Sequence, residues 1–295
     1  MPINIYSTPQ EITAELPAVY YHKSYFQTQT YQDFIAFSDK NFFTAFDLLD
    51  EVAISIPKSP FGSIFCLNSY VKGEYFMDKT VSHLKEKGIR KIVITHPSAI
   101  YRSFLDETEL IKYGFKPSFS DINQHVILNN EWESSIHKMQ KRKLESLQNE
   151  GFEFRKMAND ELETAHKFMT VCRQAQGLQI NISWEHLKTL NEQLPGKYEC
   201  FGVFREGKIS ALCIAVNVSD EVAYYYLPGT SPMFRNQSPM VMLIAGMVNY
   251  YRENGFKYLD LGVSSIEGKP QETLKMFKER MGAVITEKPT LTYEF

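Results

Sequence analysis

The sequence predicts an α/β protein with mixed sheets that contains one structural unit twice, and three observations support this prediction. Apolar segments with the length of strands alternate with amphipathic segments with the length of helices. The chain has 295 residues, which is enough for two ordinary domains. Three glycines of the first half recur in the second half at a nearly constant offset: Gly62 and Gly229 (229 − 62 = 167), Gly88 and Gly255 (255 − 88 = 167), and Gly114 and Gly282 (282 − 114 = 168).

The glycine offsets indicate a duplication because three pairs agree. Glycine commonly ends a helix, so a single pair would mean little. The surrounding residues also correspond, since Gly88 lies in "HLKEKGIRKIVI" and Gly255 lies in "YYRENGFKYLDL". We therefore expect residues 50–128 and 198–295 to superpose as two copies of one α/β unit.

The second half predicts strands (β) and helices (α) in the order β-α-α-β-β-β-α-β-α-β. Ser183 is expected to begin the second helix, and the pair Pro195-Gly196 to end it. Ser238 is expected to cap the third helix, with Pro239 at its first position. The expected elements are strand 152–157, helices 160–176 and 183–194, three strands within 198–227, helix 239–253, strand 256–262, helix 271–281 and strand 283–294.

The first half predicts the same final elements, although no clear pattern precedes residue 50. A further helix, 131–149, is expected between the halves. The expected domains are an N-terminal unit (1–130), a linking helix (131–150) and a C-terminal unit (151–295) that carries the active pocket. The first unit is interpreted as a degenerate copy. Its expected elements are strands 52–56, 63–68, 89–95 and 119–128 and helices 74–87 and 99–113.

Composition and charge exclude several classes of protein. The chain is 43% hydrophobic and 23% charged, which is typical of a soluble globular protein. A net charge of −3 gives no general attraction to nucleic acid, so DNA is not expected as a partner. The longest apolar segment, 240–248, is too short to insert into a membrane, and the first residues do not resemble a secretory signal. We therefore expect a cytoplasmic protein.

The cysteines and histidines predict no metal site. Cys66, Cys172, Cys200 and Cys213 are scattered without a CxxC pair, which is typical of reduced core residues. A catalytic thiol is the less favoured alternative. No histidine stands at a diagnostic spacing from an acidic residue.

The expected order of strands and helices resembles the GNAT acyltransferase fold. Two such units joined by a basic helix resemble the Fem-type aminoacyltransferases of peptidoglycan bridge formation and their uncharacterised GNAT-like relatives. Three segments carry this resemblance: "KMQKRKLESLQNEGFEF" (138–154), "YLDLG" (258–262) and "LKMFKERMG" (274–282). They are similar to the family's basic helix before its second domain, to its late strand and to its FK-x-x-x-G helix.

The resemblance implies transfer of an acyl or aminoacyl group from a thioester or ester donor to an amine. The implied donor is acyl-coenzyme A or aminoacyl-tRNA, and the implied acceptor is a small-molecule amine or a peptide. The loop 228–239 lacks the QxxGxG/A spacing that GNAT enzymes use for coenzyme A. This favours an alternative function, a non-catalytic GNAT-like module that binds a nucleotide or acyl ligand. A separate nucleotide-binding α/β class is disfavoured because GxGxxG and GxxxxGKS are absent.

Catalysis in a GNAT unit occurs where two neighbouring parallel strands separate, here 222–227 and 256–262. The freed backbone N–H groups can stabilise an oxyanion. Tyr226 is the candidate general acid, and Tyr224 the candidate substrate contact. The alternative for either tyrosine is packing in the core. Asp260 is the candidate base for the acceptor amine, or else a structural partner of a nearby cation such as Lys278 or Arg235.

The loop before helix 239–253 is the candidate site for the donor's phosphate, because helix N-termini attract anions. Its candidate residues are Gly229, Arg235, Asn236 and Ser238. Arg235 would add a bidentate hydrogen-bond donor, and a solvated loop arginine is the alternative.

The remaining candidates lie in the last loop, the last helix and the linking helix. Ser264 and Ser265 are expected to line the acceptor pocket, together with Gly268. Lys275 and Lys278 share a helix face and are candidate substrate contacts, with a solvated face as the alternative. A separate set in the linking helix is predicted to bind a polyanion such as tRNA or a nucleotide, or else forms an ordinary surface helix: Lys138, Lys141 and Arg142.

Overall fold

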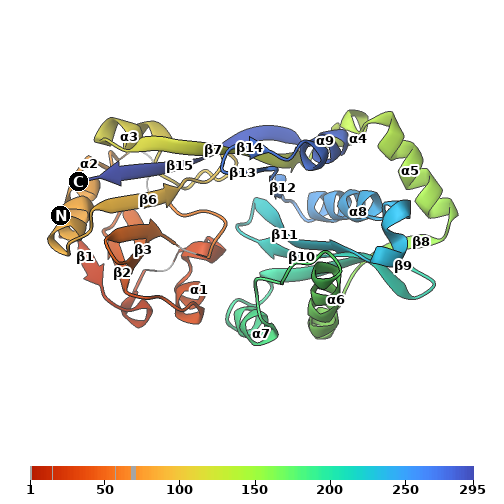
Figure 1. Cartoon of the computed structure of the whole chain (residues 1–295), viewed down its shortest axis with the longest axis horizontal. Coiled ribbons are helices and arrows are strands. Elements are labelled where there is room, and N and C mark those ends of the chain that lie inside the picture. Colours follow the sequence, from red (N-terminus) through yellow and green to blue (C-terminus); the bar gives the residue numbers. More distant parts are fainter. Residues whose placement is uncertain (1, 15, 57, 68–70) are drawn as a thin grey trace. The chain divides into compact units, whose positions relative to one another are not determined.

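The computed structural model describes residues 2–14, 16–56, 58–67 and 71–295 (Figure 1). The chain divides into two compact units. Unit 1 comprises Met1–Ile122, Ser265–Pro270 and Thr286–Phe295, and unit 2 comprises Asn123–Ser264 and Gln271–Ile285. Both ends of the chain therefore belong to unit 1.

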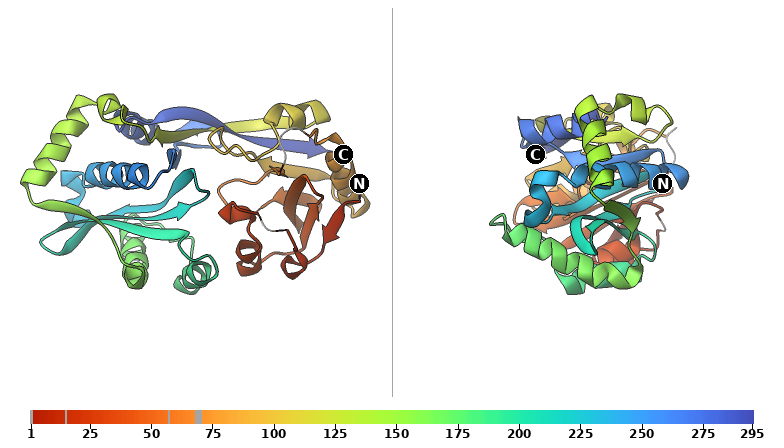
Figure 2. Two further views of the ribbon diagram at one scale, coloured as in Figure 1. Left: turned by 180° about the vertical axis from the view of Figure 1, so that it is seen from behind. Right: turned by 90° about the vertical axis from the view of Figure 1, so that its right-hand side faces the viewer.

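Unit 2 is a sheet with helices on both faces. The strand order is β7-β12-β11-β10-β9-β8. Helix α8 covers one face and α6 and α7 the other (Figure 1, and Figure 2 from behind). The elements that contribute to unit 2 are β7 (Lys116–Ile127), α4 (Trp132–Ser135), α5 (Lys138–Asn149), β8 (Phe152–Lys156), α6 (Leu162–Gln174), α7 (Trp184–Gln193), β9 (Tyr198–Arg205), β10 (Lys208–Asn217), β11 (Val222–Thr230), α8 (Met240–Glu253), β12 (Tyr258–Val263), α9 (Glu272–Arg280) and β15 (Val284–Glu294). This order confirms the expected GNAT order of the second half.

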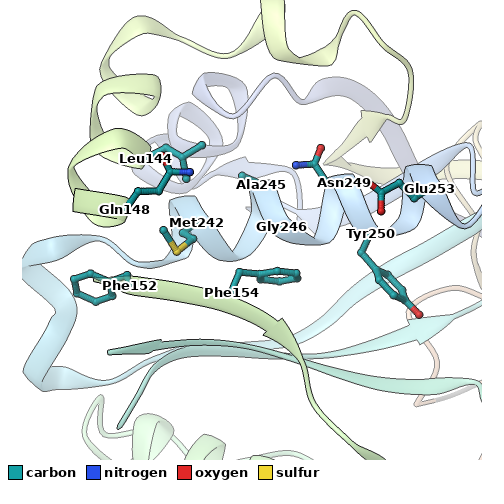
Figure 3. Close-up of a pocket in the computed structure, with 10 residues that line it drawn as sticks. All are labelled: Leu144, Gln148, Phe152, Phe154, Met242, Ala245, Gly246, Asn249, Tyr250 and Glu253. Atoms are coloured by element: carbon teal, nitrogen blue, oxygen red, sulfur yellow. The ribbon is translucent and has the colours of Figure 1, made fainter. Parts of the chain in front are cut away.

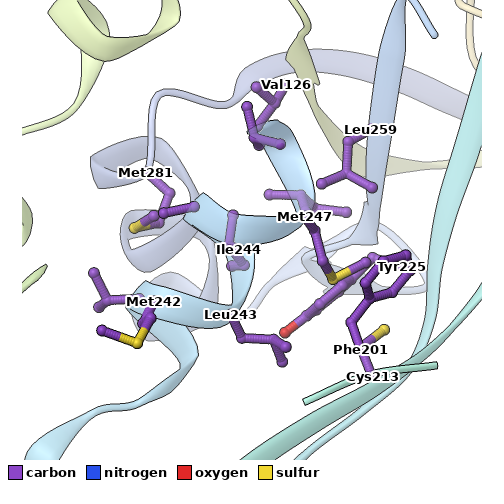
Figure 4. Close-up of a cluster of buried hydrophobic side chains, with 14 of the residues drawn as sticks. Val126, Phe201, Cys213, Tyr225, Met242, Leu243, Ile244, Met247, Leu259 and Met281 are labelled. Carbon is purple, nitrogen blue, oxygen red and sulfur yellow. The ribbon is translucent and has the colours of Figure 1, made fainter. Parts of the chain in front are cut away.

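The core of unit 2 lies between α8 and the sheet. Leu243, Ile244 and Met247 recur at helical spacing and are at most 1% exposed. Figure 4 shows them within one apolar cluster with residues of the sheet such as Tyr225 and Leu259. Burying each such aliphatic side chain contributes about 1.5–3 kcal/mol. The cluster therefore fixes α8 against β11 and β12, the two strands that form the candidate site.

Strands β11 and β12 run parallel and separate after three residue pairs. Val222, Ala223 and Tyr224 pair with Tyr258, Leu259 and Asp260, and the ladder stops there although β11 continues to Thr230. The expected separation of these two strands is thus present.

The strands of unit 1 follow the order β1-β2-β3-β4-β6-β15-β7 and run in mixed directions, and β5 pairs with β3. The 3-10 helices η1 (Pro9–Glu11) and η2 (Val19–Tyr21) lie in the part for which the sequence shows no clear pattern. Its other elements are β1 (Asn4–Tyr6), α1 (Lys23–Thr28), β2 (Phe34–Ser38), β3 (Phe42–Leu49), β4 (Val52–Ser55), β5 (Phe65–Cys66), α2 (Glu74–Glu86), β6 (Lys91–Thr95) and α3 (Glu107–Tyr113).

The two halves of the sequence exchange their last strands. The C-terminal strand β15 pairs antiparallel with β6, with Glu294 opposite Lys91. Strand β7, from the first half, pairs antiparallel with β12, with Ile127 opposite Tyr258. The registers are equivalent, because 258 − 91 = 167 and 294 − 127 = 167. Each unit is therefore completed by the strand that the other half of the sequence supplies.

Two of the three glycine pairs occupy equivalent positions. Gly88 and Gly255 follow α2 and α8 with φ of 85° and 81°. The next N–H in each case bonds five residues back, from Ile89 to Leu84 O (3.1 Å) and from Phe256 to Tyr251 O (3.0 Å).

Gly114 and Gly282 follow α3 and α9 in the same manner. The third pair was wrong, because Gly62 lies in the loop after β4 whereas Gly229 lies inside β11.

The structure corrects several further expectations. The helix expected at 99–113 begins only at Glu107, because Asp106 caps it by accepting a bond from the Thr108 N–H. The helix expected at 131–149 is two helices, α4 and α5, separated by extended residues Ile136 and His137. Ser238 adopts a left-handed conformation (φ 58°) and its side chain does not cap α8. The expected loop after β12 contains a hairpin, β13 (Ser265–Ile266) and β14 (Lys269–Pro270).

Candidate active site

A cavity of about 790 Å³ lies in unit 2 at the end of β11 and the beginnings of α8 and α9. We call it the donor pocket. Its lining residues are Gln176, Pro228, Gly229, Thr230, Arg235, Ser238, Met240, Gln271, Glu272, Thr273, Leu274 and Phe277.

Three of the four predicted phosphate-binding residues line the donor pocket. These are Gly229, Arg235 and Ser238, whereas Asn236 does not line it. Arg235 is exposed and forms no salt bridge with any residue that the structure describes. Its guanidinium is therefore available to an anionic ligand.

The beginning of α8 adds backbone donors to the same wall. The Val241 N–H donates a hydrogen bond to Ser238 O (3.1 Å), and Pro239 has no N–H. Met240 lines the pocket and is the first helical residue, so its N–H has no intrahelical acceptor. The wall thus presents one guanidinium and the N-terminal end of a helix dipole.

The two candidate tyrosines lie on β11 before the pocket, on the same face of the strand. Tyr226 is half-buried and lies two residues before Pro228, which lines the pocket. Its ring centroid is 6.1 Å from that of Tyr224. Burial raises the pKa of Tyr226, which keeps its hydroxyl protonated at neutral pH. Neither ring is among the residues that line the donor pocket.

Asp260 occupies a buried structural position in β12. It is 3% exposed, and its Oδ1 accepts hydrogen bonds from Asn123 Nδ2 and from the Gly262 N–H, both at 2.9 Å. These bonds compensate the cost of burying a carboxylate. These bonds give Asp260 a structural environment, and the sequence did not indicate its partner Asn123 of β7.

Lys278 is buried, so a solvated face was the wrong alternative for this lysine. It is 4% exposed, and its Nζ donates to Gly262 O and Val263 O, each at 2.9 Å. Burial lowers its pKa to about 8, opposed by the charge of Asp260. The ammonium thus occupies the end of β12 beyond its last pairing with β11. Lys275 is half-buried, and its Nζ lies 4.0 Å from Glu272 Oε2 and 3.7 Å from Glu279 Oε1.

The two serines after β12 are buried and bonded within their own units. In unit 2, Ser264 Oγ donates to Gln124 Oε1 (2.6 Å). In unit 1, Ser265 Oγ bonds to Asp121 Oδ1 (2.6 Å), which also accepts from the Gly268 N–H (3.0 Å). Both serines fix the chain after β12, and neither lines the donor pocket.

Sequence reasoning missed the part of the pocket that α9 and α6 supply. Thr273, Leu274 and Phe277 lie on α9, and Gln176 follows α6. Phe277 belongs to the segment "LKMFKERMG", which stands out in the sequence. The sequence did not indicate that this helix turns Phe277 toward the pocket. The predicted polyanion residues lie on α5, where Lys138 and Arg142 are exposed and Lys141 is half-buried.

Two further findings concern the whole described chain. Within residues 2–14, 16–56, 58–67 and 71–295, no cluster of three or more His, Cys, Asp or Glu side chains is arranged to hold a metal ion. In the same residues, no helix combines the length and the apolar character needed to span a membrane.

Comparisons with known proteins agree with this geometry. Residues 135–270 match the family model described as Acetyltransferase (GNAT) domain, which indicates acyl transfer as the class of chemistry. Comparison with curated protein sequences gave no significant match.

Three solved structures share the fold. The crystal structure of FemX is 15% identical, covers 100% of this chain and 98% of its own, and has a TM-score of 0.68. The C-terminal domain (DUF2156) of a putative lysylphosphatidylglycerol synthetase from Agrobacterium fabrum is 12% identical, covers 85% and 80%, and has a TM-score of 0.63. A tandem GNAT protein from the clavulanic acid biosynthesis pathway is 8% identical, covers 99% and 98%, and has a TM-score of 0.53. The chain therefore has a tandem GNAT fold, and its expected resemblance to Fem-type proteins is confirmed.

Proposed function

We propose that unit 2 transfers an acyl or aminoacyl group from a thioester or ester donor to an amine. The observation that carries this proposal is the donor pocket, which lies beside the separated end of β11 and the beginning of α8. A carbonyl placed beyond Tyr224 would meet the edge of β11 that β12 no longer pairs. Backbone N–H groups on such an edge stabilise a developing oxyanion.

The reaction forms a C–N bond and breaks a C–S or C–O bond. A neutral amine attacks the donor carbonyl, whose electron pair moves to oxygen in the tetrahedral intermediate. Collapse of that intermediate expels a thiolate or alkoxide, which takes a proton from the Tyr226 hydroxyl. The ammonium formed on the acceptor releases its proton to water, and the Tyr226 phenolate regains a proton from water, which restores the enzyme. We assign Asp260 a positioning role, because its carboxylate holds Asn123 and Gly262.

The donor is held by its phosphate. Arg235 and the Met240 N–H at the beginning of α8 form the anion-binding wall of the pocket. Acyl-coenzyme A and aminoacyl-tRNA both present phosphate. The exposed Lys138 and Arg142 of α5 would add affinity only for the larger polyanion, tRNA.

The proposal is tested by supplying the purified chain with acyl-coenzyme A or aminoacyl-tRNA and a panel of primary amines. We expect release of free thiol or of deacylated tRNA that depends on the amine. A donor that raises the melting temperature but is never consumed would contradict transfer and support the non-catalytic binding module. Salt dependence separates the two donors, because release of counterions from tRNA makes its binding fall steeply with salt.

A further inference from the structure

A second cavity of unit 2 lies along the side of α8 and shares no residue with the donor pocket. Its volume is about 440 Å³, and α5, β8 and α8 form its walls (Figure 3). We call it the α8 groove. Its lining residues are Leu144, Gln148, Phe152, Phe154, Met242, Ala245, Gly246, Asn249, Tyr250 and Glu253.

The floor and walls of the groove are apolar. Figure 3 shows Phe154 of β8 beneath α8, with Leu144 of α5 near Met242 at the beginning of α8. Gly246 allows this arrangement, because a Cβ there would come within 2.3 Å of the Phe154 ring. A glycine inside a helix costs about 1 kcal/mol relative to alanine. The aromatic floor thus depends on a residue that weakens the helix.

One carboxylate supplies the only charge among the residues that line the groove. Glu253 is the only charged residue among those that line the groove, and it has no ion pair or side-chain hydrogen bond with any described residue. The Gln148 side chain is likewise uncommitted within the described chain. Asn249 Oδ1 accepts a bond from Arg252 Nη2 (3.0 Å).

The Tyr250 hydroxyl is engaged outside the groove. It bonds to Lys156 Nζ (2.7 Å) and to Glu199 Oε1 (3.1 Å), and it points away from the groove in Figure 3. The groove therefore combines an apolar body with one free negative charge, a pattern that suits an amphiphilic cation.

We propose that the α8 groove binds a small molecule with an apolar or aromatic body and a cationic amine. The body lies on Phe154, beneath Gly246, and the ammonium lies at Glu253. This site is separate from the transfer reaction, and its test does not depend on activity.

The experiment measures binding of 4-phenylbutylamine, 4-phenylbutanol and 4-phenylbutyrate by isothermal titration calorimetry. The three probes share the body and differ only in the charge of the head. We expect the amine to bind about threefold to fivefold tighter than the alcohol, because Glu253 is exposed and such pairs are weak. The carboxylate should bind more weakly than the alcohol. Equal affinity for all three probes would overturn the proposal.

Three variants locate the site. Glu253→Gln should lower the affinity of the amine to that of the alcohol and leave the alcohol unchanged. Glu145→Gln, an exposed position on α5 outside the groove, is the matched control and should change neither. Gln148→Trp, also exposed, should fill the groove and abolish binding of amine and alcohol while the melting temperature is retained. Unchanged amine binding in Glu253→Gln or in a folded Gln148→Trp would place the probe elsewhere and overturn the proposal.

Discussion

Units 1 and 2 satisfy an equivalent backbone carbonyl in different ways. In unit 1, Thr95 O at the end of β6 accepts a bond from the Gly62 N–H at 2.8 Å. In unit 2, the equivalent carbonyl belongs to Gly262 (262 − 95 = 167) and accepts a bond from the ammonium of Lys278 at 2.9 Å. A backbone segment thus occupies the end of the strand in one unit, and a side chain from α9 occupies it in the other.

The segment around Gly62 fills the space between β4 and β6. A Cβ on Gly62 would come within 2.4 Å of Ser55 O, so the backbone lies directly against the end of β4. Tyr21 fixes the segment, because its hydroxyl accepts from the Ser63 N–H (2.6 Å) and donates to Ser63 O (2.8 Å). Ser63 Oγ also bonds to His96 Nδ1 at 3.0 Å. Unit 1 therefore closes the place where unit 2 leaves its strands apart, and we propose on this ground that unit 2 is the active copy.

The largest expected effect concerns the hydroxyl of Tyr226. Tyr226→Phe should lower kcat by about 10²- to 10⁴-fold with little change in the KM of the donor, because the proton is transferred only in the transition state. Tyr224→Phe, on the same strand and face, is the control and should retain most of the activity. Equal losses in the two variants would remove the distinction between these tyrosines. Steady-state kinetics with one donor and one amine measures this.

The next effect concerns Lys278 and tests how unit 2 keeps its strand end in place. Lys278→Met leaves Gly262 O and Val263 O without their donor, which should cost about 1–3 kcal/mol in the free energy of unfolding. Lys275→Met, in the same helix but in ion pairs with the exposed Glu272 and Glu279, should cost well under 1 kcal/mol. Urea denaturation of the two variants measures the difference. Similar costs would show that the buried lysine does not hold β12.

A pH effect is expected in unit 1, where burial lowers the pKa of His96 to about 4. Its unfolded-state value is near 6.5, so the unfolded chain binds more protons between pH 4 and 6.5. The stability that neutral His96 contributes is therefore present above pH 6.5 and is lost as the pH falls toward 4. Between pH 7 and pH 4.5 the free energy of unfolding of the original protein should fall by about 1–3 kcal/mol more than that of His96→Gln. Urea denaturation of both proteins at both pH values measures this difference. The same loss in both proteins would remove His96 from the account.

The smallest expected effect concerns Arg235, because its guanidinium is exposed. Arg235→Ala should raise the KM of the donor about tenfold and leave kcat nearly unchanged, since the phosphate contact is equally strong in ground and transition states. Lys188→Ala, on α7 and outside the pocket, is the control. An unchanged KM would move the phosphate site away from the beginning of α8.

Local signals explain why most of the second half could be predicted. Ser183 accepts a bond from the His186 N–H and begins α7 where expected. The apolar spacing from Met240 to Tyr251 describes the buried face of α8. By contrast, the exchange of β7 and β15 leaves no local signal in the sequence. The pairing of β7 with β12 has the same register as the pairing of β15 with β6, so the pattern of residues does not show which unit each strand joins.

The site was predicted less completely than the fold. The loop residues Gly229, Arg235 and Ser238, which line the pocket, could be chosen from the sequence because helix N-termini follow a simple rule. The burial of Lys278 was not found, because a lysine on an amphipathic helix usually faces water and only the carbonyls of β12 draw it inward. The segment that closes unit 1 was also missed, since Gly62 was paired with Gly229, which lies inside β11.

The central claim, that the strands of unit 2 are open to a donor and those of unit 1 are closed, is tested by hydrogen exchange with an unreactive donor analogue. An S-alkyl coenzyme A and an RNA carrying a stable aminoacyl amide at its 3′ end serve as the two probes. We predict that a bound probe slows exchange in β11 beyond Tyr224 and at the beginning of α8, and leaves residues 52–56 and 61–66 of unit 1 unchanged. Slowed exchange in the unit 1 segments, or equal effects in both units, would contradict the claim.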